Sequence, residues 1–282
     1  MKRNNGDRYK TRLRDNKFAS RIQTRIWSET PSSGNPYIAE QCRCHGYDLL
    51  ELIEKRSFVD VLYLLFQGQL PSKQHSRLLE ALMIGLINPG PRHPATRAAM
   101  NSGIGKTDIA HILPIGQLTI GGSHLGGREV ISAMRFLNKS YKSNPQDIVE
   151  QAVNSSKKPD VGDWHIVPGF GTRFGGIDLV PKQIAAKITR MPGSGHLLQW
   201  ASEFAGLLEN TVECGWLAPG LAAAVFSDLG FHPRTGAGLF QLFNSPGILA
   251  HGLEMANKSI SAMPFIDNKH YVIGPHKQSR SD

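Results

Sequence analysis

The sequence predicts an all-α protein, and three observations support this fold class. Apolar residues recur at helical spacing through most of the chain from about residue 47 onward. Prolines and glycines separate these segments into predicted helices of about 10 to 20 residues. Strands do not alternate with the helices, which argues against an α/β fold. The composition, 40% hydrophobic and 20% charged, is that of an ordinary globular protein.

The first predicted helices are bounded by recognisable start and stop residues. In residues 57–66 the apolar residues are so dense that the helix must be buried on most sides, and Gly68 ends it. Ser72 caps the following helix, which the Pro/Gly run at 88–91 ends. Pro94 then opens the next helix, because proline is favoured in the first helical turn.

The remaining helices follow the same pattern to the end of the chain. We predict them at about 108–120, 127–138, 145–156, 181–191, 195–211, 218–229 and 234–257. His270–Ile273 is the best strand candidate and predicts one side of a small hairpin. The polar stretches at 138–144 and 155–160 are predicted loops that bracket a region able to form a smaller domain.

The positive charge is concentrated at the N-terminus. Residues 1–25 hold nine Lys and Arg against two Asp, a net charge of +7, which leaves +2 of the total +9 for the remaining residues. This distribution favours a solvated or subunit-contacting arm at 1–26 over nucleic-acid binding, and coenzyme A phosphates could also use it.

Two further function classes are disfavoured. Cys42, Cys44 and His45 do not have the spacing of a zinc site, so we expect no metal, and the odd number of cysteines indicates a reducing compartment. The sequence has no apolar run of about 20 residues and no apolar signal-peptide core at its start. We therefore expect a cytoplasmic protein with no membrane contact.

Two glycine-rich segments are the candidate functional loops. In Gly121–Glu129, glycines lie on both sides of His124, just before a predicted helix, and allow close approach of backbone and ligand. In Val167–Gly176, four glycines expose backbone N–H groups, and Arg173 offers a guanidinium to a phosphate or carboxylate. Each segment predicts a functional loop; the alternatives are a structural histidine in the first segment and a simple tight turn in the second.

The order of five segments resembles that of citrate synthases and citryl-CoA lyases. The resemblance covers about residues 40–275 and rests on Gly46–Glu54, Phe58–Pro71, His124–Gly127, Pro168–Gly171 and Gly247–Glu254. It implies a large helical domain (27–126 and 216–282) interrupted by a small helical domain (127–215). It also implies a homodimer, and a cleft that closes over a coenzyme A thioester, which is the substrate.

The resemblance implies a carbon–carbon bond lyase or synthase acting on a CoA thioester. Such chemistry needs a group to polarise the thioester carbonyl, a base for the carbon-bound proton and an acid/base partner at the other oxygen. His124 matches the family histidine with the first role. Thr172 stands where the family has a second catalytic histidine, and Pro219 where it has a catalytic aspartate. Substitute carboxylates could be Glu213, Asp228 or Asp178.

The same resemblance implies the binding residues. Those expected to contact coenzyme A are Pro168, Gly169, Phe170, Gly171 and Arg173, and those expected to contact the organic acid are His93, Arg173, Asn244 and His251. The family's carboxylate-binding arginines are missing, because Leu179, Val180 and Asn244 stand near their positions, which leaves Arg173 and Lys182. A tricarboxylate such as citrate is thus poorly provided for. The alternative is a non-catalytic member that binds CoA or another subunit.

Overall fold

We analysed a computed structural model that describes residues 21–264, 266–267, 269–272 and 274. The chain forms two compact units, Met1–Arg56 and Ser57–Asp282, and each is described by itself. Most of the predicted basic arm, residues 1–20, lies outside the described residues. The predicted division into a large and a small domain at 127 and 215 stays a prediction.

The first unit contains a small antiparallel sheet that the sequence analysis missed. Strands β1 (Trp27–Pro31) and β2 (Ala39–Cys44) pair, and β2 pairs with β3 (Tyr47–Asp48). Helix α1 (Leu49–Lys55) follows, and the Asp48 carboxylate caps it by accepting hydrogen bonds from two backbone N–H groups of its first turn. Every residue of β1 is exposed, so the strand carries no alternating apolar pattern.

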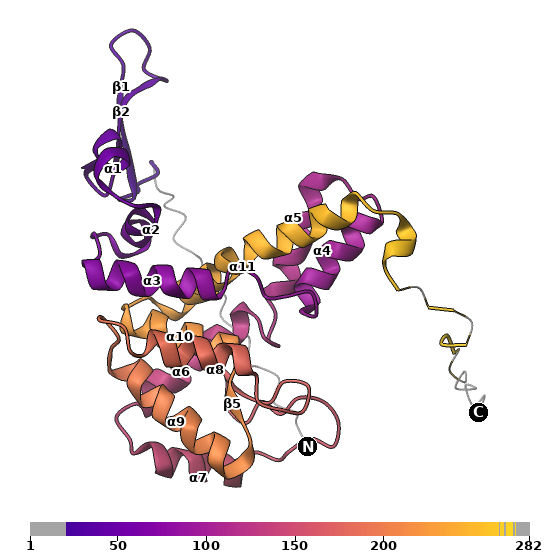
Figure 1. Cartoon of the computed structure of the whole chain (residues 1–282). Helices are drawn as coiled ribbons and strands as arrows, with labels where there is room; N and C mark the ends of the chain where they lie inside the picture. The colour runs from indigo at the N-terminus through magenta and orange to yellow at the C-terminus, as the bar shows by residue number, and fades with distance from the viewer. Residues whose placement is uncertain (1–20, 265, 268, 273, 275–282) are drawn as a thin grey trace, which may run out of the picture. The chain divides into compact units, whose positions relative to one another are not determined.

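The second unit is helical, which confirms the predicted all-α class (Figure 1). Its helices are α2 (Phe58–Gln67), α3 (Lys73–Gly85), α4 (Pro94–Ile104), α5 (Ile109–Ile120), α6 (Gly127–Ser140), α7 (Pro145–Ser155), α8 (Leu179–Ile188), α9 (His196–Val212), α10 (Ala218–Asp228) and α11 (Pro233–Ala256). The short strands β4 (Phe170–Gly171) and β5 (Gly215–Trp216) pair antiparallel, and a 3-10 turn covers Ile260–Ala262. No helix of the described residues is both long and apolar enough to cross a bilayer.

The predicted helix boundaries are confirmed at their capping residues. Ser57 and Asp60 form a reciprocal capping box at the start of α2, and Gly68 ends that helix in the left-handed conformation at φ 73°. Ser72 caps α3 and Asn144 caps α7 through side-chain hydrogen bonds to backbone N–H groups.

Helix α10 lies at the centre of the core. All of its residues from Pro219 to Phe226 are buried, as expected for a helix that is small and apolar on every side. It packs against α6, α9 and α11. Helix α6 is amphipathic, and it buries a stripe at helical spacing, namely Val130, Ala133, Met134 and Leu137.

The strand predicted at His270–Ile273 is wrong for its described part. His270 lies in a turn, where its backbone N–H and its Nδ1 both contact Asp267 Oδ1, at 3.1 and 2.6 Å. Tyr271 and Val272 are not in a strand, and Ile273 lies outside the described residues. Local hydrogen bonding by an aspartate thus overrides the β propensity of this segment.

Candidate functional site

The loop between α3 and α4 is docked onto a break in α11. Pro246 lies inside α11 and has no N–H, so the regular hydrogen-bond ladder is interrupted there. The next N–H, that of Gly247, donates instead to the Ile87 carbonyl at 2.9 Å. A Cβ atom on Gly247 would lie 2.5 Å from Asn88 Cα, so only glycine allows this approach. The break in α11 therefore positions residues 87–93.

His251, a predicted substrate contact, supports this loop. Asn88 Oδ1 accepts a hydrogen bond from Gly90 N at 2.9 Å, which fixes the orientation of the amide. Asn88 Nδ2 therefore donates to His251 Nε2, 3.2 Å away. His251 is half-buried behind Asn88 and does not line the cavity described below.

His93 is buried with both ring nitrogens engaged. Its Nδ1 accepts a hydrogen bond from Ala95 N at 3.2 Å, so it caps α4. Its Nε2 must then carry the proton and donate to the Leu125 carbonyl, also at 3.2 Å. Burial is the main cause that lowers the pKa of His93. The ring is therefore neutral near pH 7 and held in one tautomer.

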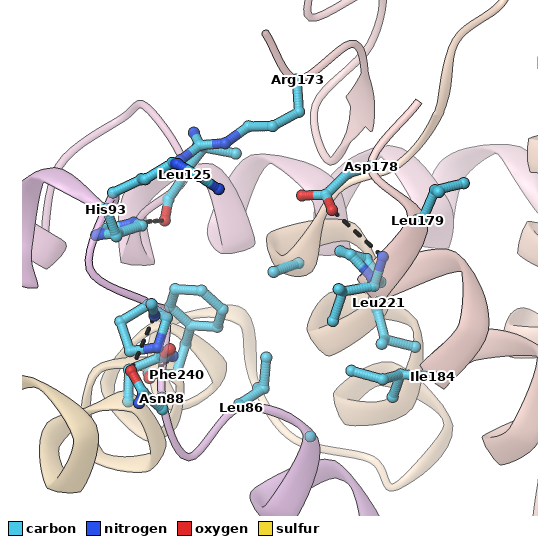
Figure 2. Close-up of a pocket in the computed structure, with 18 of the residues that line it drawn as sticks. Leu86, Asn88, His93, Leu125, Arg173, Asp178, Leu179, Ile184, Leu221 and Phe240 are labelled. Atoms are coloured by element: carbon cyan, nitrogen blue, oxygen red, sulfur yellow. Dashed lines mark hydrogen bonds between the residues drawn. The ribbon is translucent and has the colours of Figure 1, made fainter. Parts of the chain in front are cut away.

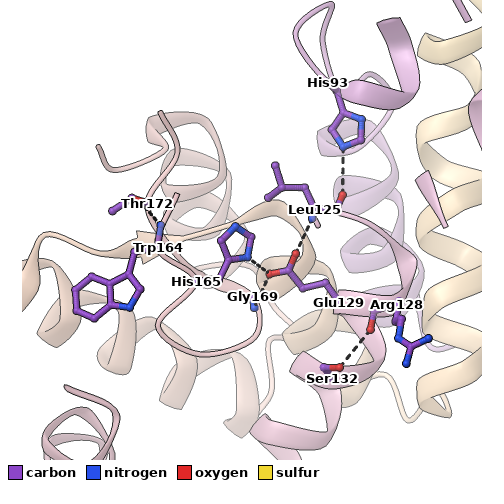
Figure 3. Close-up of polar contacts among 9 residues, drawn as sticks. All are labelled: His93, Leu125, Arg128, Glu129, Ser132, Trp164, His165, Gly169 and Thr172. Atoms are coloured by element: carbon purple, nitrogen blue, oxygen red, sulfur yellow. Dashed lines mark hydrogen bonds and ion pairs between the residues drawn. The ribbon is translucent and has the colours of Figure 1, made fainter. Parts of the chain in front are cut away.

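A buried carboxylate joins the two candidate loops (Figure 3). Glu129, only 5% exposed, accepts hydrogen bonds from Leu125 N at 2.7 Å and from Gly169 N at 3.1 Å. It also contacts His165 Nδ1 at 2.8 Å. The segments around His124 and Pro168, some 40 residues apart in sequence, thus meet at one side chain.

His124 and His165 lie side by side as a result. Their ring centroids are 4.8 Å apart and the rings are tilted by 32°. Desolvation, and then the neighbouring His165, lower the pKa of His124, although the His124 side chain is exposed. His165 Nε2 is buried and has no hydrogen-bond partner in the described part of the chain. Leu125, next to His124, has φ 54°, a conformation that leucine rarely adopts.

The second glycine-rich loop uses its polar groups internally. The Thr172 hydroxyl accepts a hydrogen bond from Trp164 N at 2.8 Å, and Thr172 N donates to the Trp164 carbonyl at 2.9 Å. Phe170 N donates to the Val167 carbonyl, and Gly169 N is held by Glu129. These backbone groups are therefore engaged within the protein, in place of the free anion-binding N–H groups that the sequence suggested.

Gly169 allows this loop to pack on the start of α10. Its φ is 83°, and a Cβ atom there would lie 2.5 Å from Gly220 Cα. Leu217 N, at the N-terminus of α10, donates to the Gly169 carbonyl at 3.0 Å. Close backbone packing thus explains at least this one of the loop's glycines.

A cavity of about 540 Å³ lies beside the joined loops (Figure 2). It falls within the usual size of small-molecule sites, roughly 300–1,000 Å³. Three of the predicted site residues line it, namely His93, Arg173 and Asn244. Leu125 also lines it, whereas His124, Thr172, His251 and Pro168–Gly171 do not.

Arg173 and Asp178 are the charged pair within the cavity. The Arg173 guanidinium stacks on the Phe174 ring at 4.6 Å and makes no ion pair with the described residues. Asp178 caps α8, and its pKa is raised mainly by desolvation, against the opposing effect of Arg173. A carboxyl with a raised pKa beside a free cation is typical of a functional site.

The other charges near the cavity differ from the sequence expectation. Lys182, proposed as a carboxylate ligand, forms an ion pair with Glu209 at 2.5 Å and does not line the cavity. Arg92, which the sequence analysis passed over, lines the rim and is exposed.

Asp178 is the only one of the three candidate substitute carboxylates that lines the cavity. Asp228 accepts hydrogen bonds from Gly195 N, Leu197 N and Leu198 N at 3.0 Å each, so it caps α9. Glu213 is exposed at the left-handed end of α9. Asp228 and Glu213 thus lie away from the cavity, whereas Asp178 lines it as well as capping α8.

Sequence reasoning missed His165, Glu129 and Arg92 as members of this site. His165 has no flanking motif, and only its tertiary contacts with His124 and Glu129 distinguish it. Glu129 stands within the first glycine-rich segment, where a charged residue entering the buried face of a predicted helix was an available signal.

Comparison with known proteins yields structural matches only. No family model and no curated protein sequence matches the chain. Citryl-CoA lyase from Hydrogenobacter thermophilus matches with a TM-score of 0.73 and 26% identity, over 92% of this chain and 96% of the lyase. ATP citrate lyase from Methanothrix soehngenii, solved with citrate and coenzyme A, matches with a TM-score of 0.72 and 17% identity, over 94% of this chain. This chain covers 44% of that larger enzyme.

A citrate synthase gives a weaker match. The enzyme from Thermoplasma acidophilum, in a ternary complex with carboxymethyl coenzyme A and oxaloacetate, has a TM-score of 0.55 and 15% identity over 80% of this chain and 59% of its own. The three enzymes share one fold with this chain across most of its length. The order of the sequence motifs and these structural matches agree, and the chain has the citrate synthase superfamily fold.

Proposed function

We propose that the protein makes or breaks a carbon–carbon bond next to a coenzyme A thioester, as citryl-CoA lyases and citrate synthases do. The observation that carries the proposal is the Glu129 carboxylate, which joins the His124 loop to the Pro168–Gly171 loop beside a cavity. Solved proteins of the same fold bind coenzyme A with citrate or carboxymethyl coenzyme A with oxaloacetate, which supports a thioester and an organic acid as ligands.

In this proposal four side chains contact the two substrates, three of them at the reacting groups and the acid. His124, kept neutral by its lowered pKa, donates a hydrogen bond to the thioester carbonyl. Asp178 is the acid/base group, and Arg173 binds the carboxylate of the organic acid. Arg92, exposed at the cavity rim, would meet an anionic part of coenzyme A. Thr172 and the Pro168–Gly171 backbone hold the loop in place, and His93 and His251 hold the cavity wall.

These groups account for every proton and electron pair that moves in the cleavage reaction. The Asp178 carboxylate accepts the hydroxyl proton of the 3-carboxy-3-hydroxyacyl-CoA substrate, and the bond between the second and third carbons of the acyl chain breaks. Its electron pair passes into the thioester enolate, whose oxygen is held by His124. Protonated Asp178 returns its proton to the terminal carbon, which gives a 2-oxo acid and acetyl-CoA. The synthase direction is the reverse sequence.

We further propose a homodimer in the cytoplasm. Ile109 and Leu118 on α5 are 62% and 82% exposed, which favours a covered surface on that helix. Sedimentation of the full chain would test this, with a dimer as the expected species and a monomer at micromolar concentration as the contrary result.

The alternative is a non-catalytic member of the fold. It is favoured by Thr172, which cannot exchange a proton near pH 7 and whose hydroxyl accepts the hydrogen bond of Trp164 N. In that case the protein would bind CoA esters or a second subunit without turnover.

Turnover separates the two hypotheses. The protein is incubated with citryl-CoA, with acetyl-CoA plus oxaloacetate, and with acetyl-CoA plus a panel of 2-oxo acids, and products are measured by mass spectrometry. We expect turnover of at least one combination, and a loss of at least about 100-fold in His124→Ala. His196→Ala, at an exposed histidine on α9, is the matched control and should keep the full rate. Binding of CoA esters without any turnover would refute the enzyme hypothesis.

A further inference from the structure

The cavity contains little fixed positive charge for a multiply charged acid. Arg173 is the half-buried guanidinium, and Arg92 is exposed at the rim, where solvent screening makes an ion pair weak. His93 also lines the cavity, but both of its nitrogens are engaged and the ring is neutral. Lys182 is held by Glu209 outside the cavity. Only one inward cation is therefore available among the described lining residues.

Much of the same cavity is lined by apolar side chains. Leu86, Leu221 and Phe240 are buried, with exposed fractions of 4%, 1% and 2%, and Ile184 also lines the cavity (Figure 2). A carboxylate placed against these side chains would lose its hydration without gaining a hydrogen bond, which is costly. A branched aliphatic group placed there would be stabilised by the same burial.

Some exposed residues that line the cavity are also apolar. Leu179 and Val180, at the start of α8, are 60% and 62% exposed and line the cavity. The Asp178 carboxylate points into the same space (Figure 2). Its negative form would repel a second carboxylate, whereas one carboxylate can be neutralised by Arg173.

Asn244 is a further polar group of the cavity wall, besides Asn88. It is 2% exposed, and its Nδ2 donates to the Phe240 carbonyl at 2.8 Å. Its Oδ1 is thus left as an acceptor for a hydroxyl group, and the second hydrogen of its amide is left as a single neutral donor.

We propose that the acid handled by this site has one carboxylate and an apolar body, as in a 2-oxo acid with a branched aliphatic side chain, in place of oxaloacetate or citrate. This rests on the proposed function. The carboxylate is held by Arg173, and the aliphatic group occupies the space bounded by Leu86, Ile184 and Leu221.

The proposal is tested by calorimetric binding of two acids, each titrated alone into the full chain, with the binding of acetyl-CoA measured separately. We expect 4-methyl-2-oxopentanoate to bind at least about tenfold more tightly than oxaloacetate. The inference would be overturned if oxaloacetate bound equally or more tightly, or if neither acid bound while acetyl-CoA did. Either result would leave the proposed thioester site unaffected. Failure of acetyl-CoA itself to bind would overturn the proposed function as well.

A substitution in the cavity lining tests independently whether the charge of the cavity determines which acid binds more tightly. Val180→Arg places a cation at the exposed mouth and should shift the preference toward oxaloacetate by at least about tenfold. Val161→Arg, at a 90% exposed position outside the cavity lining, is the matched control and should leave the preference unchanged. The same preference in both variants would contradict the assignment of the cavity to the acid.

Discussion

Replacing Glu129 by glutamine should loosen the junction of the two loops. The carboxylate is 5% exposed and receives hydrogen bonds from two backbone N–H groups, Leu125 N and Gly169 N, and from one imidazole, that of His165. A glutamine keeps one acceptor oxygen but turns its NH₂ group toward at least one of these donors. The lost charge-assisted bond and the unpaired buried donor together should cost about 2–4 kcal/mol of unfolding free energy.

Urea unfolding of the full chain, followed by circular dichroism, measures this cost, and the melting temperature should fall by roughly 5–10 °C. Glu203→Gln is the matched control, because Glu203 is exposed on α9, and its effect should stay within about 0.5 kcal/mol. If Glu129→Gln is as stable as this control, the carboxylate does not join the loops and the reasoning fails.

Three further predictions follow from the same structure. Gly169→Ala should lower the unfolding free energy by more than about 2 kcal/mol, because φ is 83° and the new methyl group would meet Gly220; an unchanged urea midpoint would contradict this packing. Asp228→Ala should cost about 2 kcal/mol, since three N–H groups at the start of α9 lose their acceptor, whereas the exposed Asp160→Ala should have little effect in the same urea titration. The rate of the proposed reaction should fall as pH drops through the raised pKa of Asp178, because only the ionised carboxyl is a base; a pH–rate profile flat from pH 7 down to an ordinary aspartate pKa would exclude this role.

Much of the helical fold could be predicted because it is encoded locally. Ser57, Ser72 and Asn144 satisfy backbone N–H groups within their own helices, and Gly68 ends α2 through its own conformation. Strand β1 could not be predicted because its residues are all exposed, and its pairing with β2 is visible only in the folded unit.

The site was predictable only in part, for a related reason. His93, Arg173 and Asn244 were named from the order of motifs, and they do line one cavity. The proximity of His165 to His124 depends on a tertiary contact through Glu129, which no local pattern records. The distinction of Asp178 from the other two carboxylates likewise required the cavity, since all three lie at the ends of helices and no sequence motif separates them.

The most direct test of the account is a crystal structure of the full chain with acetyl-CoA. We predict that the thioester carbonyl oxygen lies within hydrogen-bond distance of the His124 imidazole, about 3 Å, with the acetyl group directed toward Asp178 and Arg173. A thioester bound elsewhere on the molecule, or one whose carbonyl is held by groups other than His124, would contradict the central claim.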